Sequence, residues 1–169
     1  MRSQAIDALD DITMASPRFL EEEHAELMGS LRSASKLGDE TGKAVGRLLE
    51  KLEPHFEEEE RLVTPCLGAL ADLAEGVDAT VHSLAQLSPQ LKERYRTFYK
   101  EHETIKERAV IAGGIAAKEM HSGIADTIEA LVHHAMVEEE VLYPSALVAC
   151  MYAERLEAES ERARNQHRG

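Results

Sequence analysis

The chain has 169 residues and a formal net charge of −13, and 43% of its residues are hydrophobic. This length suits a single domain with a substantial core. A surface this acidic repels the phosphates of nucleic acids and of anionic lipids, so we expect no nucleic acid and no membrane as a partner. Aromatic residues make up only 4%, while Ala, Leu, Glu, Lys and Arg dominate, which favours an all-α fold.

The two cysteines, Cys66 and Cys150, form no C-x-x-C unit. The sequence therefore indicates neither a disulfide framework nor a thiolate zinc site. The first residues, 1–11, lack the apolar segment of a signal peptide, and no apolar run is long enough to span a bilayer. These features predict a cytoplasmic protein.

Four helices are predicted in chain order. The first covers residues 16–38 and the second covers 39–74. A connection over 77–87, with room for one short helix, leads to the third helix at 88–114. The fourth begins near residue 118 and runs past residue 150. A serine followed by a proline, a typical helix start, opens the first and third helices, and glycines mark the stops.

Three regions follow from this division. Residues 1–15 form an N-terminal extension, residues 16–153 form the helical bundle, and residues 154–169 form a highly charged C-terminal helix end or tail.

Each predicted helix carries an apolar stripe with steps of three and four residues, as expected for the core-facing side of a bundle helix. Every stripe is interrupted by one histidine, and the second and fourth stripes carry a glutamate four residues after it. Residues four apart lie on the same helix face, so each glutamate points inward with its histidine. The stripes are Leu20, His24, Leu27 and Leu31; Val45, Leu48, Leu52, His55, Glu59, Leu62 and Cys66; Leu91, Tyr95, Phe98, His102, Ile105 and Ala109; and Ile124, Leu131, His134, Glu138, Val141 and Ser145.

An unpaired carboxylate in a bundle core costs several kcal/mol in desolvation, and two that face each other cost more. No Lys or Arg occupies a matching position on the four stripes. A bound cation removes this cost, because carboxylates supply negative charge and imidazoles supply neutral nitrogen ligands.

The chain also repeats itself at an interval of 78–79 residues. His55 and Glu59 recur as His134 and Glu138, each pair followed by a proline ten residues after its histidine. The Glu-His pair that ends at His24 recurs at residue 102. Two such halves facing each other predict a two-metal site, with one ion for each half and both glutamates able to bridge.

This pattern resembles the hemerythrin-like (HHE cation-binding) family over residues 17–147. The resemblance implies an antiparallel up-down-up-down four-helix bundle around a di-iron centre. The implied metal ligands are His24, His55, Glu59, His102, His134 and Glu138. It further implies that His24 and His55 bind one iron ion and that His102 and His134 bind the other. Glu59, Glu138 and an oxo or hydroxo group would bridge the two ions.

The sequence departs from the oxygen-carrying hemerythrins at two positions. Lys106 stands where those proteins have a second histidine on the third helix. Their last carboxylate is an aspartate five residues after its histidine, whereas here Glu138 lies at four and Glu139 at five as the fallback. Both irons could then keep an open position, as in hemerythrin-like regulators and iron-sulfur repair proteins.

Several residues near the predicted ligands are assigned other roles. A single histidine on an apolar stripe is often an ordinary core residue, but four of them beside two glutamates favour ligation. His133 is expected at the flank, His121 is the best spare ligand, and Glu58 is a weaker candidate than Glu59. Tyr99 is expected as a polar residue behind His102, with Met28 and Lys106 as walls of the open positions.

Three functions remain in competition at this point. The leading hypothesis is a di-iron protein that binds O₂, nitric oxide or peroxide for storage, sensing or stress protection. The second is a di-iron enzyme or iron donor that acts in peroxide or nitric oxide detoxification or in iron-sulfur cluster repair. The third is a zinc-filled or metal-free bundle used for protein contacts. Whether the protein is an enzyme, and whether it forms a homodimer, stays open.

Overall fold

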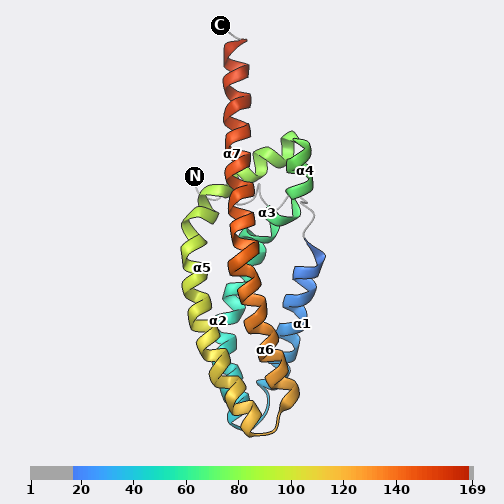
Figure 1. Ribbon diagram of the computed structural model, residues 1–169, viewed down its shortest axis with the longest axis vertical. Coiled ribbons are helices and arrows are strands. Elements are labelled where there is room, and N and C mark those ends of the chain that lie inside the picture. Colours follow the sequence, from blue (N-terminus) through green and yellow to red (C-terminus); the bar gives the residue numbers. More distant parts are fainter. Residues whose placement is uncertain (1–16, 168–169) are drawn as a thin grey trace.

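The computed structural model describes residues 17–167, which are almost entirely helical (Figure 1). The predicted extension at 1–15 and the predicted helix start at Ser16 lie outside the described residues. The elements are α1 (Arg18–Ala34), α2 (Glu40–Leu62), α3 (Thr64–Gly68), α4 (Leu70–Glu75), α5 (Asp78–Lys118), α6 (Ser122–Val137), the π-helical turn η1 (Glu138–Leu142) and α7 (Tyr143–Gln166).

Four rods form the bundle: α1, α2, α5 and the continuous rod of α6, η1 and α7 (Figure 1). Successive rods run in opposite directions, and α1 packs against α2 and α6 while α5 packs against α2, α6 and α7. The predicted all-α, up-down-up-down bundle is therefore confirmed. The C-terminal part of α7 projects beyond the other rods (Figure 1). No helix among the described residues combines the length and the hydropathy that a membrane span requires.

The predicted start of the third helix at Ser88 and Pro89 is wrong. Helix α5 begins ten residues earlier, at Asp78, and carries Pro89 in its interior. Val81, Leu84 and Ser88 are buried and continue the stripe of Leu91 upstream in steps of three and four residues. Packing of this face outweighs the hydrogen bond that the proline removes from the helix.

Two further helix ends differ from the prediction. Helix α5 continues through Gly113 and ends at Lys118. A Cβ atom at Gly113 would lie 3.2 Å from Cγ2 of Ile128, so this glycine serves the close packing of α5 on α6. The second predicted helix is broken after Leu62 into α2, α3 and α4, and Gly76 ends the series in the left-handed conformation, with φ 74°.

The π-helical turn η1 shifts the inward face of the fourth rod. A π turn repeats after five residues rather than after three or four. Tyr143, five residues after Glu138, is therefore buried in the core, whereas Val141 is exposed. The predicted continuation of the stripe through Val141 and Ser145 is wrong for this reason, and the core-facing side continues at Tyr143, Ala146 and Cys150.

The apolar core has two parts on either side of the interrupting histidines. One part centres on Leu31, Val45 and Leu48 near the α1–α2 and α5–α6 turns. The other centres on Leu84 and Phe98 beneath α3 and α4. The Cys66 and Cys150 thiols meet in this second part with 2.7 Å between their Sγ atoms, and their hydrogen bond, together with burial, raises the pKa of Cys66.

We expect Leu84→Ala to lower the free energy of unfolding by about 2–5 kcal/mol, because it removes a fully buried leucine and leaves a cavity. Val110→Ala, at a side chain that is 67% exposed on the same helix, should change it by less than about 0.5 kcal/mol. Urea denaturation followed by circular dichroism measures both. Equal effects of the two substitutions would show that residues 78–88 do not belong to the core-packed part of α5.

Candidate metal centre

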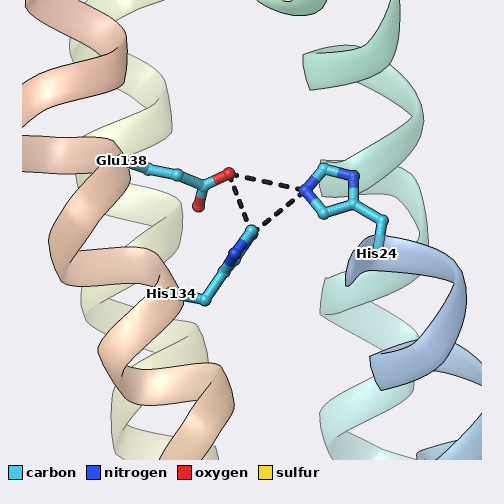
Figure 2. A group of neighbouring side chains, drawn as sticks. All are labelled: His24, His134 and Glu138. Atoms are coloured by element: carbon cyan, nitrogen blue, oxygen red, sulfur yellow. Dashed lines mark hydrogen bonds and ion pairs between the residues drawn. The ribbon is translucent and has the colours of Figure 1, made fainter. Parts of the chain in front are cut away.

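All six residues predicted as metal ligands project into the middle of the bundle, where each is at most 3% exposed. They fall into two groups whose ligand atoms lie within 4.8 Å of one another: His24, His134 and Glu138, and His55, Glu59 and His102. Figure 2 shows the first group, with His24 on one rod facing His134 and Glu138 on another. Both groups combine imidazole nitrogen with carboxylate oxygen, a donor set that suits a divalent cation.

In the first group the Nε2 atoms of His24 and His134 are 3.0 Å apart. Oε1 of Glu138 lies 3.0 Å from Nε2 of His134 and 3.5 Å from Nε2 of His24 (Figure 2). Three inward-facing donor atoms thus converge on one point between α1, α6 and η1.

In the second group Oε1 of Glu59 lies 3.2 Å from Nε2 of His55 and 3.8 Å from Nε2 of His102. The two groups are joined by their glutamates. Oε2 of Glu138 lies 3.3 Å from Nε2 of His102, and Oε2 of Glu59 lies 3.9 Å from Nε2 of His24. Each carboxylate therefore presents one oxygen to each group, as a bridging ligand must.

The pairing of the histidines differs from the expectation. The resemblance implied that His24 and His55 share one ion and that His102 and His134 share the other. The structure instead groups His24 with His134 and His55 with His102. The physical reason is which imidazoles face each other: the ring centroids of His24 and His134 are 4.9 Å apart between α1 and α6, and those of His55 and His102 are 4.6 Å apart between α2 and α5.

Each of the four histidines also turns its Nδ1 atom toward a glutamate on a neighbouring rod. The Nδ1 atoms of His24, His55 and His102 donate a hydrogen bond, and that of His134 forms an ion pair. These outer carboxylates come from residues adjacent in sequence to a predicted ligand, and they obey the same repeat of 78–79 residues. The pairs are His24 with Glu60 at 3.3 Å, His134 with Glu23 at 3.1 Å, His55 with Glu101 at 2.9 Å and His102 with Glu139 at 3.1 Å.

These outer carboxylates fix the tautomer and the orientation of the imidazoles. A hydrogen bond from Nδ1–H to a carboxylate leaves the Nε2 lone pair free to bind a metal ion. The same bond makes Nε2 a stronger ligand for the metal. Glu23, Glu60 and Glu101 had no role assigned from the sequence, because only the tertiary structure brings them beside a histidine. Glu139, the fallback ligand, belongs to this outer set and also accepts from Nζ of Lys106 at 2.7 Å.

Tyr143 is the site residue that sequence reasoning missed. Its hydroxyl donates to Oε1 of Glu59, and its Oη atom lies 3.0 Å from Nε2 of His102 and 3.4 Å from Nε2 of His55. The expected polar neighbour, Tyr99, lies farther out and donates to the backbone carbonyl of Glu139 at 2.9 Å. One feature of the sequence could have indicated Tyr143: it directly precedes Pro144, the proline that the internal repeat places after each histidine and glutamate pair.

The remaining spare candidates lie away from the two groups. His133 is exposed, as expected for a flank residue. His121 pairs with Asp39 at 2.8 Å beside the turn between α5 and α6. Glu58 forms ion pairs with Arg61 and Arg94 on the outside of the bundle.

The two inner carboxylates carry the clearest sign of a bound cation. Oε2 of Glu59 and Oε2 of Glu138 are buried and have no hydrogen-bond partner among residues 17–167. A carboxylate oxygen in this position costs several kcal/mol unless a positive charge faces it. The donor set and these two oxygens therefore fit a metal site shared between the groups.

In the metal-free protein, the close approach of the acidic side chains and the histidines shifts the pKa values of both. Burial raises the pKa of Glu138, but the neighbouring imidazoles of His102, His134 and His24 outweigh it and hold the pKa well below its usual value. Burial lowers the pKa of His134, but Glu138 and the charges of Glu23 and Glu59 raise it to about 9. Without metal, a proton on His134 thus supplies part of the positive charge that the two carboxylates require.

The family model described as Hemerythrin HHE cation binding domain matches residues 16–146. The chain belongs to the hemerythrin HHE cation-binding family. This match and the two His/Glu groups make it a helical protein of the cation-binding type. Comparisons with curated proteins and with solved structures gave no match for this hemerythrin-like chain.

The metal-free hemerythrin-like protein should lose stability as pH rises from about 6.5 to about 9. The folded-state pKa of His134 is raised, so its contribution is fully present below the unfolded-state value of about 6.5 and disappears as pH passes the folded value of about 9. Urea denaturation of chelator-treated protein at several pH values measures this loss. His134→Gln should weaken the dependence and leave the part that the raised pKa of His55 contributes, whereas His133→Gln, at the exposed neighbour, should preserve all of it.

Glu101→Gln should weaken metal binding about 10- to 100-fold, because it removes the carboxylate that orients His55. Competition with a chromophoric chelator measures the affinity. Glu103→Gln, at an exposed position on the same helix, is the matched control and should leave the affinity unchanged. An unchanged affinity in Glu101→Gln would contradict the orienting role of this glutamate.

Proposed function

We propose that the protein holds two iron ions between its helices and uses them to bind O₂ or a related small molecule, such as nitric oxide or peroxide, for storage, sensing or stress protection. His24, His134 and Glu138 would hold one ion, and His55, Glu59 and His102 would hold the other. The observation that carries this proposal is a pair of buried carboxylate oxygens, one on Glu59 and one on Glu138, that have no hydrogen-bond partner in the described part of the chain.

The donor set favours iron over zinc. Structural zinc sites are closed and almost always four-coordinate, and catalytic ones use about three protein ligands around a single ion. Here four imidazoles and two shareable carboxylates surround two adjacent positions, the pattern of two-metal carboxylate proteins built in helical bundles. When bound, ferrous ions supply the electrons that binding of O₂ requires.

Apolar rings shape the space around the donors. The ring of Phe56 stacks on His24 with 3.8 Å between centroids, and the ring of Phe98 meets His55 edge-on at 5.7 Å. Both phenylalanines are buried. They exclude water from the donors and hold the imidazole planes, and both effects strengthen the electrostatic attraction between a cation and the carboxylates.

A second candidate function is a di-iron enzyme or an iron donor in peroxide or nitric oxide detoxification or in iron-sulfur cluster repair. Two surface cavities favour it, because they reach the outer edges of ligand histidines. One, of about 390 Å³, is lined by Pro54, His55 and Glu101, and the other, of about 220 Å³, is lined by His24 and Met28. Such cavities give small molecules, or a departing ion, a short path to the centre.

Loading the protein with Fe(II) without oxygen and then admitting air tests the leading proposal. Reversible appearance of a ligand-to-iron charge-transfer spectrum, lost again on removal of oxygen, is the expected result. Rapid irreversible oxidation with many turnovers of peroxide or nitric oxide would favour the enzyme instead. Repair of a damaged iron-sulfur cluster with loss of iron from this protein would favour the donor.

Substitution of the ligands gives a separate prediction. His55→Ala and Glu59→Ala should each lower the iron content per chain and the visible absorbance, because each removes an inward donor. Elemental analysis and absorption spectroscopy measure both quantities. His82→Ala removes an exposed histidine of α5 and should keep the iron content of the parent protein. Full iron content in both ligand variants would refute the proposed ligand set.

A further inference from the structure

The two halves of the metal centre are related by the internal repeat, but they differ at one position. Tyr143 lies five residues after Glu138 and directly before Pro144. The equivalent residue in the first half is Thr64, five residues after Glu59 and directly before Pro65. Both follow a break in the regular α-helix, at η1 in one half and at the junction of α2 and α3 in the other. The repeat thus pairs a tyrosine with a threonine.

Tyr143 fills space inside the second group. Its Oη atom lies close to three donors of that group: it bonds to Glu59 and lies 3.0 Å from His102 and 3.4 Å from His55. The ring is fully buried and stacks on His102 with 5.3 Å between centroids, so the hydroxyl is held in place. A cation bound by these three donors would therefore lie next to the phenolic oxygen of Tyr143.

The first group has no such oxygen. Thr64 is also buried, but its short side chain makes no hydrogen bond to His24, His134 or Glu138 within residues 17–167. The contacts of this group are among its own members, the bridging carboxylate of Glu59 and the outer glutamates. Two histidines, two shared carboxylates and one bridging group leave one position open on an ion that takes six ligands.

We propose that Tyr143 releases its phenolic proton to solvent as metal binds, and that its oxygen then takes the last coordination position of the ion in the His55, Glu59 and His102 group. Small molecules then bind only to the ion held by His24, His134 and Glu138. The inference rests on the proposed function, since it requires two ions in the centre. It makes the symmetric donor set functionally asymmetric through a single residue difference between the halves.

Azide binding to the oxidised, iron-loaded protein tests this assignment. Elemental analysis first gives iron per chain, and spectroscopic titration then gives azide bound per two irons. We expect one azide in the unaltered protein and two in Tyr143→Phe, which keeps the ring and removes the oxygen. Thr64→Val removes the hydroxyl of the equivalent residue at similar size and should still bind one azide.

Two azides in the unaltered protein, or one in Tyr143→Phe with two irons bound, would overturn the assignment while leaving the two-iron centre intact. Fewer than two irons in the unaltered protein would overturn the proposed function and the assignment with it. If Tyr143→Phe fails to fold, the visible spectrum of the unaltered ferric protein decides. A tyrosine-to-iron charge-transfer band supports the assignment, and its absence overturns it.

Discussion

The burial of Glu59 and Glu138 in the dry middle of the bundle is the constraint on which the rest of the structure depends. Each carboxylate leaves one oxygen without a hydrogen bond from the described residues. Burying a charged carboxylate costs several kcal/mol, and the whole stability of a domain this size is about 5–15 kcal/mol. The fold tolerates two of them only if positive charge lies between them, either on protonated imidazoles or on metal ions.

The residues around the two carboxylates are arranged to supply this positive charge. Four rods each contribute one inward histidine, and each histidine is oriented by a glutamate from the neighbouring rod. These outer acids point the Nε2 atoms inward and keep the imidazoles electron-rich. The internal repeat explains why both halves use the same arrangement. The exception is the exchange of Thr64 for Tyr143, and that exchange is where we place the functional difference between the two ions.

The sequence predicted the parts of the centre that follow from helical periodicity. His55 with Glu59, and His134 with Glu138, sit four residues apart on regular helix, so their common inward face could be read directly. Tyr143 could not be found in this way, because the π turn at Glu138–Leu142 shifts the register by one residue. The outer glutamates were hidden for another reason: in sequence they are ordinary acidic runs, and only the packing of rods places them beside histidines.

Helix boundaries show the same limit of local signals. Asp39 starts α2 as predicted, with its carboxylate accepting from the backbone N–H of Gly42 at 3.0 Å. Gly76 also ends its helix as predicted. Pro89 and Gly113 look like a start and a stop, yet both lie inside α5, where tertiary packing decides. The pairing of the histidines likewise depends on which imidazoles of neighbouring rods face each other, which no single helix reveals.

Anaerobic calorimetric titration of the metal-free protein with Fe(II), repeated in buffers of different ionisation enthalpy, tests the central claim most directly. The stoichiometry of the titration gives the number of ions bound per chain. The dependence of the binding heat on the ionisation enthalpy of the buffer gives the number of protons released. The account predicts two ions per chain at neutral pH, with protons released, because the pKa values of His55 and His134 are raised and both imidazoles must lose a proton to bind metal. Absence of binding, or binding without proton release, would contradict it.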